Sequence, residues 1–287
     1  MTLLKILILA IIQGAAELLP VSSSAHVIVA EKLMGFDPVS PEMTLLLVML
    51  HTGTMFAVIV YFWSAWKVSY FRSREVFLSF AKRVVVATAF TALVGFLLKF
   101  FIEKVVLRNV PHAEVELLFG NMTLIAVSLF VVGLFIIYAG LKRSRSNNGS
   151  SLGYKESSWI GAIQGLCLPF RGFSRSGATI SMGLTLGIGK VQAEEFSFAL
   201  AVVLTPPVIA RETLRLLKAH SVSVAHAPSV LTLFYPSLLA MVFSFVTGVL
   251  ALRLLSIWLD RGYWHLFGFY CLAASLAVFM LHSIFGI

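Results

Sequence analysis

The chain has 287 residues, of which 59% are apolar and only 12% are charged, and its mean hydropathy is +0.94. These values exclude a water-soluble globular domain and indicate an integral membrane protein. The formal net charge of +9 does not indicate nucleic-acid binding, because the Lys and Arg residues cluster in short loops beside apolar runs, which is the distribution that membrane topology produces.

Taken in chain order, the apolar segments are of two kinds. A membrane-spanning helix needs about 20 consecutive apolar residues, and six runs are long enough: 43–66, 80–102, 117–141, 191–210, 229–256 and 264–286. Two further regions, 3–35 and 159–189, are pairs of short apolar stretches that Pro, Gly and Ser interrupt near the middle. Neither stretch of such a pair can cross a bilayer alone, so each region is predicted to be a re-entrant hairpin.

The two interrupted regions resemble each other. The first contains AIIQGAAELLPVSSSAH and the second GAIQGLCLPFRGFSRSGAT, so that Gln13 corresponds to Gln164 and Ser22 lies opposite Ser174 with one residue inserted. Each region is followed by three spanning runs, and an odd number of crossings leaves the second half upside down relative to the first. The sequence therefore predicts an all-α integral membrane fold of two inverted repeats in a single membrane domain, residues 1–147 and 148–287.

The charges of the loops predict the orientation in the membrane. Two loops, 67–83 and 142–155, are rich in Lys and Arg and are expected in the cytoplasm. The loop between them contains three Glu residues and is expected outside. The first hairpin then enters the membrane from outside and the second from the cytoplasm. The polar, Ser-rich segment 142–158 is predicted to be a flexible linker between the two halves.

The irregular backbone at the two interruptions must be buried in protein or line a wet cavity, because lipid cannot satisfy its N–H and C=O groups. Pro20 ends the first half-helix, and Ser22 or Ser23 is a natural N-cap for the second. In the other hairpin Gly172 is expected to form the turn and Ser174 the cap. Two helix N-termini then point into one cavity, where their free N–H groups favour an anion, and phosphate above all.

The side chains beside the two caps suit phosphoryl transfer. Arg175 offers a planar fork of donors for phosphate, and hydroxyl donors come from Ser174, Ser176 and Thr179. Gln13 and Glu17 share one helical face, and Ser23 lies three residues before His26 on the opposing half-helix. In this hypothesis Ser23 attacks phosphorus and His26 shuttles the proton, while Arg175 neutralises charge and Glu17 orients a base or holds a divalent cation.

Several of these polar residues also have plain structural explanations. Capping accounts for Ser22 and Ser24, hydrogen-bonded packing for His51, and a position at a helix start near the interface for Glu194 and Glu195. Glu17 and Arg175 differ, because ionisable groups at membrane depth are costly and indicate function.

The stretches QGAAELLPVSSSAH and GFSRSGATIS resemble the two signature regions of the bacterial undecaprenyl-diphosphatase family, also called bacitracin-resistance proteins. The family pattern has a Glu or Gln four residues before a Glu, then a Pro-Val-Ser-Ser run and a histidine, and later a Pro-Gly-x-Ser-Arg-Ser-x-x-Thr motif. The resemblance extends over nearly the whole chain, including the order of segments.

This resemblance implies the removal of the terminal phosphate from a C55 polyprenyl diphosphate, which yields the monophosphate carrier for cell-wall synthesis. It implies a divalent cation, Mg or Ca, held with the help of Glu17 and Gln13, and a nucleophilic Ser23 beside His26. The phosphate-binding set is Ser174, Arg175, Ser176 and Thr179, to which we add Ser22 and Arg171. The expected location is the bacterial inner membrane, with a site that opens to the periplasm. The expected partners are the lipid substrate and the bilayer, and a homodimer is left open.

Two positions depart from the family pattern. Arg171 stands where the family has the proline of its second motif, and Gln13 stands where an acid is commoner. The extra arginine is expected to strengthen anion binding, and the amide to weaken cation binding. The main alternative to an enzyme is an inverted-repeat transporter or flippase for an anionic lipid. The Ser23–His26 pair argues against it, since transport needs binding groups but no nucleophile.

Overall fold

The computed structural model describes residues 2–36, 41–108, 115–143, 151–222 and 230–285, and the regular elements in these ranges are all helices. They are α1 (Leu3–Leu18), α2 (Ser23–Met34), α3 (Pro41–Ser69), α4 (Arg74–Phe101), a π-helical turn (Ile102–Val106), a 3-10 turn (Val115–Leu118), α5 (Met122–Arg143), α6 (Tyr154–Cys167), α7 (Arg175–Thr185), α8 (Lys190–Val222), α9 (Val230–Asp260) and α10 (Trp264–Phe285). The predicted all-α class is confirmed. The predicted linker falls partly on residues 144–150, which lie outside the described residues.

Six helices are long and apolar enough to cross a membrane, and they coincide with the six runs predicted from the sequence: Met43–Ser69, Arg74–Val106, Met122–Lys142, Lys190–Arg211, Tyr235–Asp260 and Trp264–Ile284. Their outer faces carry exposed apolar side chains, and on α4 Leu93, Phe96 and Phe100 are all more than half exposed. A surface of this kind needs lipid around it. The chain is therefore a multi-pass membrane protein.

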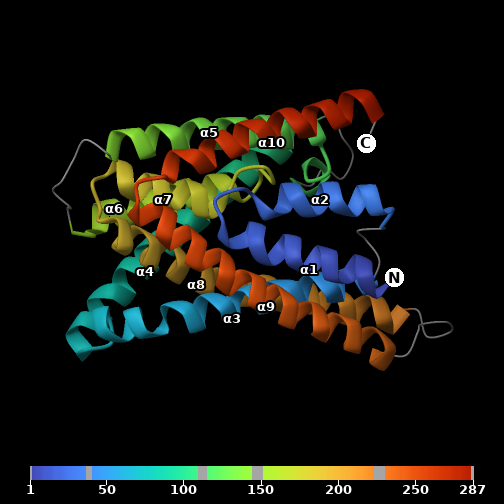
Figure 1. Cartoon of the computed structure of the whole chain (residues 1–287), viewed down its shortest axis with the longest axis horizontal. Coiled ribbons are helices and arrows are strands. Elements are labelled where there is room, and N and C mark those ends of the chain that lie inside the picture. The colour runs from blue at the N-terminus through green and yellow to red at the C-terminus, as the bar shows by residue number, and fades with distance from the viewer. Residues whose placement is uncertain (1, 37–40, 109–114, 144–150, 223–229, 286–287) are drawn as a thin grey trace.

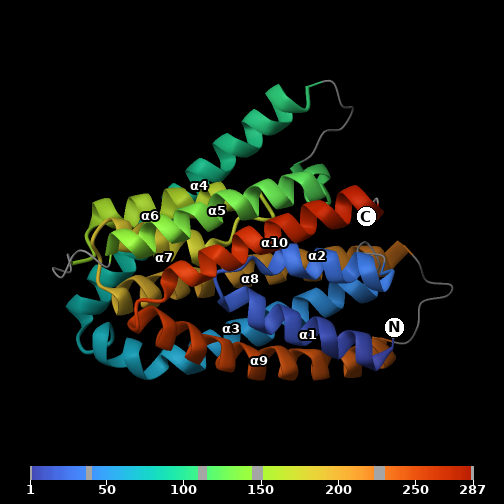
Figure 2. The same cartoon turned by 45° about the horizontal axis from the view of Figure 1, so that its top comes forward.

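The helices pack in a reciprocal pattern across the two halves of the chain. α1 packs on α9, α6 packs on α4, and α5 lies along α10. Figures 1 and 2 show α5 and α10 side by side, and Figure 2 shows the far end of α4 projecting away from the other helices. Gly14 lets α1 approach α9, because an added Cβ would overlap the side chain of Thr247.

The first pair of short helices turns back where the sequence predicts. α1 ends two residues before Pro20, and Ser22 caps α2 by accepting a hydrogen bond from the Ala25 amide at 3.4 Å. Ser22 has a φ of 67°, the one non-glycine residue with positive φ in the described chain. Such a conformation costs free energy and is typical of functional sites.

The second pair turns in the same way. Ser174 caps α7 by accepting a hydrogen bond from the Gly177 amide at 3.2 Å, as predicted. Gly172 lies in the preceding turn, and it must lack a side chain because a Cβ would overlap the Ile125 carbonyl of α5. Close approach to a neighbouring helix is therefore what this glycine provides.

The turns of the two pairs touch near the centre of the molecule. The Ser22 hydroxyl donates to the Arg171 carbonyl at 2.8 Å, and the Ser176 hydroxyl donates to the Leu19 carbonyl at 3.2 Å. Figure 1 shows α1 and α2 approaching from one end of the molecule and α6 and α7 from the other. The N-termini of α2 and α7 are thereby brought to one place.

Candidate active site

A cavity of about 170 Å³ lies where the two turns meet. Its polar lining comes from three segments of the chain that are distant in sequence: Glu17, Ser22, Ser23, Ser24, His51, Arg171, Ser174, Arg175 and Ser176. The structure thus brings most of the predicted site residues to one cavity. Gln13, His26 and Thr179 are not among its lining residues.

The carboxylate of Glu17 is the centre of the hydrogen-bond network in this cavity. Its Oε2 accepts the Ser23 hydroxyl at 2.5 Å and the Gln13 amide at 3.1 Å. Its Oε1 forms an ion pair with Nη2 of Arg175 at 3.3 Å. Both charged side chains are about four-fifths buried, so their attraction is screened less than that of a surface pair. Glu17 therefore joins the first hairpin to the second.

Arg175 has donor capacity left over. Its Nη1 is buried and has no hydrogen-bond partner among the described residues. A buried N–H without an acceptor costs free energy, and a guanidinium fork suits an anion with two or more oxygens. The arginine is therefore poised for an anionic ligand in addition to its pairing with Glu17.

The predicted hydroxyl groups divide by location. Ser22, Ser174 and Ser176 lie in the cavity wall, where they also cap helices and join the two turns. Thr179 lies one helical turn beyond Arg175, donates to the Arg175 carbonyl at 2.8 Å and contacts Ser197 at 2.6 Å. Thr179 is 1% exposed and supports the start of α7 from behind.

Arg171 also lines the cavity. Its guanidinium carbon lies 4.1 Å from the centroid of the Phe119 ring, a cation–π contact that fixes the side chain. The cavity wall thus has a second arginine, at the position where the sequence departs from the family pattern.

His26 lies away from Ser23. Its Nδ1 is 2.8 Å from the Ser22 carbonyl, which can only accept, so Nδ1 carries the proton. Nε2 then accepts from the Tyr270 hydroxyl at 2.7 Å, and the two rings stack. The structure does not show the expected contact between Ser23 and His26, because the Ser23 hydroxyl points to Glu17. The role of His26 stays a prediction.

The sequence reasoning gave His51 a packing role, yet this residue lies in the cavity wall. It belongs to α3, where its Nδ1 is 2.8 Å from the Leu47 carbonyl. The signal that points to it is the polar run His51-Thr52-Gly53-Thr54 in the middle of an otherwise apolar span.

Comparison with known proteins identifies the family of the chain. A family model described as "Bacitracin resistance protein BacA" matches residues 6–277. The chain belongs to this family. The BacA match includes both interhelical turns and every residue of the candidate site.

Relatives in the BacA family match over nearly their full length. The chain is 56% identical to "Undecaprenyl-diphosphatase 2" of Acinetobacter baylyi over 98% of each chain. It is 30% identical to "Undecaprenyl-diphosphatase" of Bdellovibrio bacteriovorus over 98% of this chain and 96% of the relative. It is 33% identical to "Undecaprenyl-diphosphatase 2" of Burkholderia thailandensis over 99% of each chain.

The donor atoms of this BacA-family site fit a divalent cation that is shared with a phosphate ligand. The described residues contain no cluster of three or more His, Cys, Asp or Glu that would hold a metal ion alone. The Glu17 carboxylate and the Ser23 hydroxyl are nevertheless hard oxygen groups in direct contact, and Gln13, which contacts Glu17 through its amide nitrogen, carries an amide oxygen beside them. Mg²⁺ binds in this way, through one or two carboxylates, waters and phosphate oxygens.

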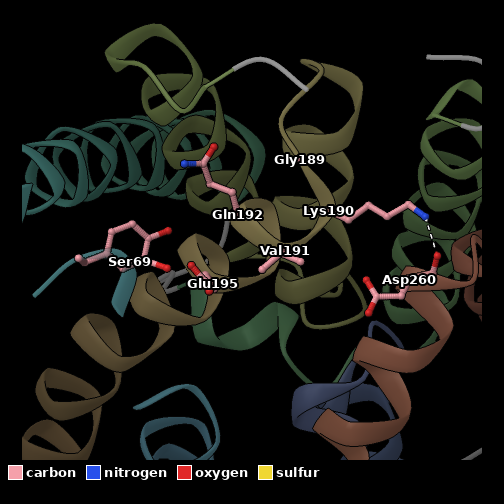
Figure 3. A pocket seen from close by; sticks show the side chains of 8 residues that line it. Ser69, Gly189, Lys190, Val191, Gln192, Glu195 and Asp260 are labelled. Atoms are coloured by element: carbon pink, nitrogen blue, oxygen red, sulfur yellow. Dashed lines mark hydrogen bonds between the residues drawn. The ribbon is translucent and has the colours of Figure 1, made fainter. Parts of the chain in front are cut away.

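A second, wider cavity of about 550 Å³ lies where α3 and α9 end and α8 begins. Figure 3 shows Glu195 and Gln192 on one side of it, and Lys190, whose ammonium donates to the Asp260 carbonyl at 2.9 Å, on the other. Glu194 and Glu195 lie in the second turn of α8 and are each 4% exposed: Glu194 accepts the Ser256 hydroxyl at 2.6 Å, and Glu195 lines this cavity. Neither a histidine nor an arginine is among the lining residues of this cavity.

Proposed function

We propose that the chain hydrolyses undecaprenyl diphosphate to the monophosphate and inorganic phosphate, and so returns the lipid carrier to cell-wall synthesis. Membership of the BacA family and the near full-length relatives named as undecaprenyl-diphosphatases support this activity. The observation that carries the chemistry is the contact of the Ser23 hydroxyl with Glu17 at 2.5 Å. A hydroxyl beside a carboxylate acceptor is a nucleophile with a base.

In the proposed reaction the Ser23 oxygen attacks the terminal phosphorus and its proton passes to Oε2 of Glu17. The undecaprenyl monophosphate leaves, and the phosphoryl group remains on Ser23. Negative charge on the transferred group is stabilised by the free Nη1 of Arg175 and by the N-terminal amides of α2 and α7. His26 stays a predicted proton relay, since Glu17 is the group that Ser23 contacts.

Glu17 and Gln13 would hold the divalent cation, together with phosphate oxygens. Such an ion supplies positive charge that neutralises the diphosphate. The donor set favours Mg²⁺ over Ca²⁺, because Ca²⁺ takes six to eight oxygen ligands and the two side chains offer few. Arg171 and Arg175, on the opposite hairpin, line the same cavity and would bind the phosphate oxygens whose charge the cation does not neutralise.

The fold supports two inverted repeats with re-entrant hairpins. The repeats exchange their packing partners, since α1 packs on α9 and α6 on α4. The halves are those expected, residues 1–147 and 148–287, with hairpins at 3–35 and 159–189. The proposed location is the bacterial inner membrane, and the basic loops support an orientation in which the first hairpin enters from the periplasm and the site faces outward. A homodimer remains an expectation.

The test is the release of phosphate from C55 polyprenyl diphosphate by the purified protein in detergent, with and without a chelator. Ser23→Ala and Arg175→Ala are expected to lose at least a hundredfold in rate, in line with the loss of a nucleophile or a charge-stabilising donor. Ser69→Ala and Lys190→Ala, in the second cavity, are matched controls and retain activity. A wild-type protein that binds the lipid but releases no phosphate would favour transport instead.

A further inference from the structure

Hydrolysis through Ser23 needs a second step that the Ser23–Glu17 pair does not complete. After the lipid monophosphate leaves, a water must attack the phosphoserine while its proton is removed. Glu17 already holds the proton that it took from Ser23, and it returns that proton to the Ser23 oxygen as the bond to phosphorus breaks. Another base in the same cavity is therefore required.

His51 is placed in this cavity by the packing of α3. Gly53 lies against α9, where an added Cβ would overlap the Met241 carbonyl. Residues two apart on a helix lie about 200° apart around its axis, so His51 faces away from α9. It points to the side on which α3 meets α1, and it lines the cavity with Glu17 and Ser23.

The tautomer of His51 is fixed by its helix. A carbonyl oxygen can only accept, so the 2.8 Å contact with Leu47 requires a proton on Nδ1. The lone pair of the neutral ring is then on Nε2, and no hydrogen bond from this atom is found to any residue that the structure describes. His26 has the same tautomer, but the Tyr270 hydroxyl covers its Nε2.

We propose that His51 is the general base of the second half-reaction, an inference that rests on the proposed phosphatase function. Nε2 takes a proton from water, the water oxygen forms a bond to phosphorus, and the bond from phosphorus to Ser23 Oγ breaks. Ser23 regains its proton from Glu17, and inorganic phosphate leaves. Once Glu17 has returned its proton to Ser23, its carboxylate lies within Coulombic range of His51 and stabilises the imidazolium. Nε2 then releases the proton to solvent, which restores the neutral ring for the next turnover.

The decisive experiment uses full-length His51→Gln in detergent and substrate labelled with ³²P in the terminal phosphate. We expect one equivalent of lipid monophosphate per protein in a burst, label retained on Ser23, and phosphate release slowed by about 10²–10⁴-fold, the usual contribution of a general base. His265→Gln is the matched control, because His265 packs against Phe269 on α10 outside the cavity. This variant turns over normally without retained label.

Two outcomes overturn the inference and leave the phosphatase function standing. One is phosphate release by His51→Gln within about twofold of wild type, and the other is an equal loss of burst and steady-state rates with no labelled protein. Absence of phosphate release from wild type would instead overturn the proposed function itself.

A second variant separates chemistry from structure. His51→Ala leaves space in the cavity, and added imidazole is expected to restore phosphate release, as a base supplied from solution does. Binding of phosphate or vanadate measured by the shift in thermal unfolding gives a readout independent of turnover, and it should be retained in both variants. A folded His51→Ala protein that binds vanadate but gains nothing from imidazole would contradict the proposal.

Discussion

The Ser23 hydroxyl donates to the Glu17 carboxylate at 2.5 Å, and this contact joins α2 to α1 across the turn. Glu17→Gln keeps the size of the side chain but removes the proton acceptor, so we expect phosphate release to fall by about 10²–10⁴-fold. Lipid binding should change much less. Glu103→Gln lies outside the cavity, removes an ion pair with Lys99 and keeps an oxygen that can accept from the Val115 amide, so this control should behave as wild type. Equal activity of Glu17→Gln and wild type would rule out Glu17 as the base.

Ser22 predicts an unusual order of stabilities among substitutions. Ser22→Ala removes the cap of α2 and the hydrogen bond to the Arg171 carbonyl, and it keeps a side chain at the strained φ of 67°. We expect this variant to lose about 2 kcal/mol of unfolding free energy. Ser22→Gly also loses the hydroxyl but relieves the backbone strain, so it should be the milder change. Thermal unfolding in detergent measures both, with Ser158→Ala as control, because the half-buried Ser158 hydroxyl bonds only to the Tyr154 carbonyl of its own helix. A glycine variant less stable than the alanine variant would show that strain at Ser22 is unimportant.

Arg171 predicts an effect on substrate binding. Its guanidinium is held over Phe119 at the cavity wall, where it can contact the diphosphate. Arg171→Ala is therefore expected to raise KM roughly tenfold, about 1.4 kcal/mol, with little change in kcat. Arg171→Pro restores the family pattern and also lacks the guanidinium, so its KM should equal that of Arg171→Ala. The backbone carbonyl that accepts the Ser22 hydroxyl is kept in both variants. A fall in kcat alone, with exposed Arg253→Lys unaffected, would contradict this.

The sequence predicted those features that local signals determine. Pro20 marks the end of α1, Ser22 and Ser174 mark the two caps, and six long apolar runs mark the spanning helices. The histidines were harder to place because their partners are distant. His26 contacts Tyr270, which is 244 positions away in the chain. The periodicity of α2 alone cannot show which of its neighbours such a side chain meets.

The same limit applies to His51. Its position within α3 was evident from the sequence, but the face of α3 that turns to the cavity depends on the close approach of Gly53 to α9. The reverse holds for Thr179, whose motif position suggested a phosphate contact. The packing of α7 turns this side chain to Ser197, within the protein core.

The close contact between α6 and α4 predicts that Gly161 does not tolerate a side chain. A Cβ at Gly161 would overlap the Ala87 backbone of α4, so Gly161→Ala must push α6 and α4 apart. We expect overpacking to cost about 1–3 kcal/mol in unfolding free energy. Gly120→Ala is the matched control, because nothing lies within 4 Å of its added Cβ. Equal thermal stability of the two variants would show that the contact between α6 and α4 yields easily.

Gln13 predicts how the site depends on Mg²⁺. Its amide is 2% exposed and donates to Glu17 at 3.1 Å. Gln13→Glu adds a second buried carboxylate, which repels Glu17 without a cation and binds with it when one is present. The variant should therefore unfold at a lower temperature than wild type in chelator, and Mg²⁺ should raise its Tm more than that of wild type.

The Mg²⁺ concentration for half-maximal phosphate release should fall roughly tenfold, about 1.4 kcal/mol. Gln192→Glu, at the second cavity, carries the same charge change and should show no such dependence. If Mg²⁺ acts alike on Gln13→Glu, Gln192→Glu and wild type, then Gln13 does not hold the cation.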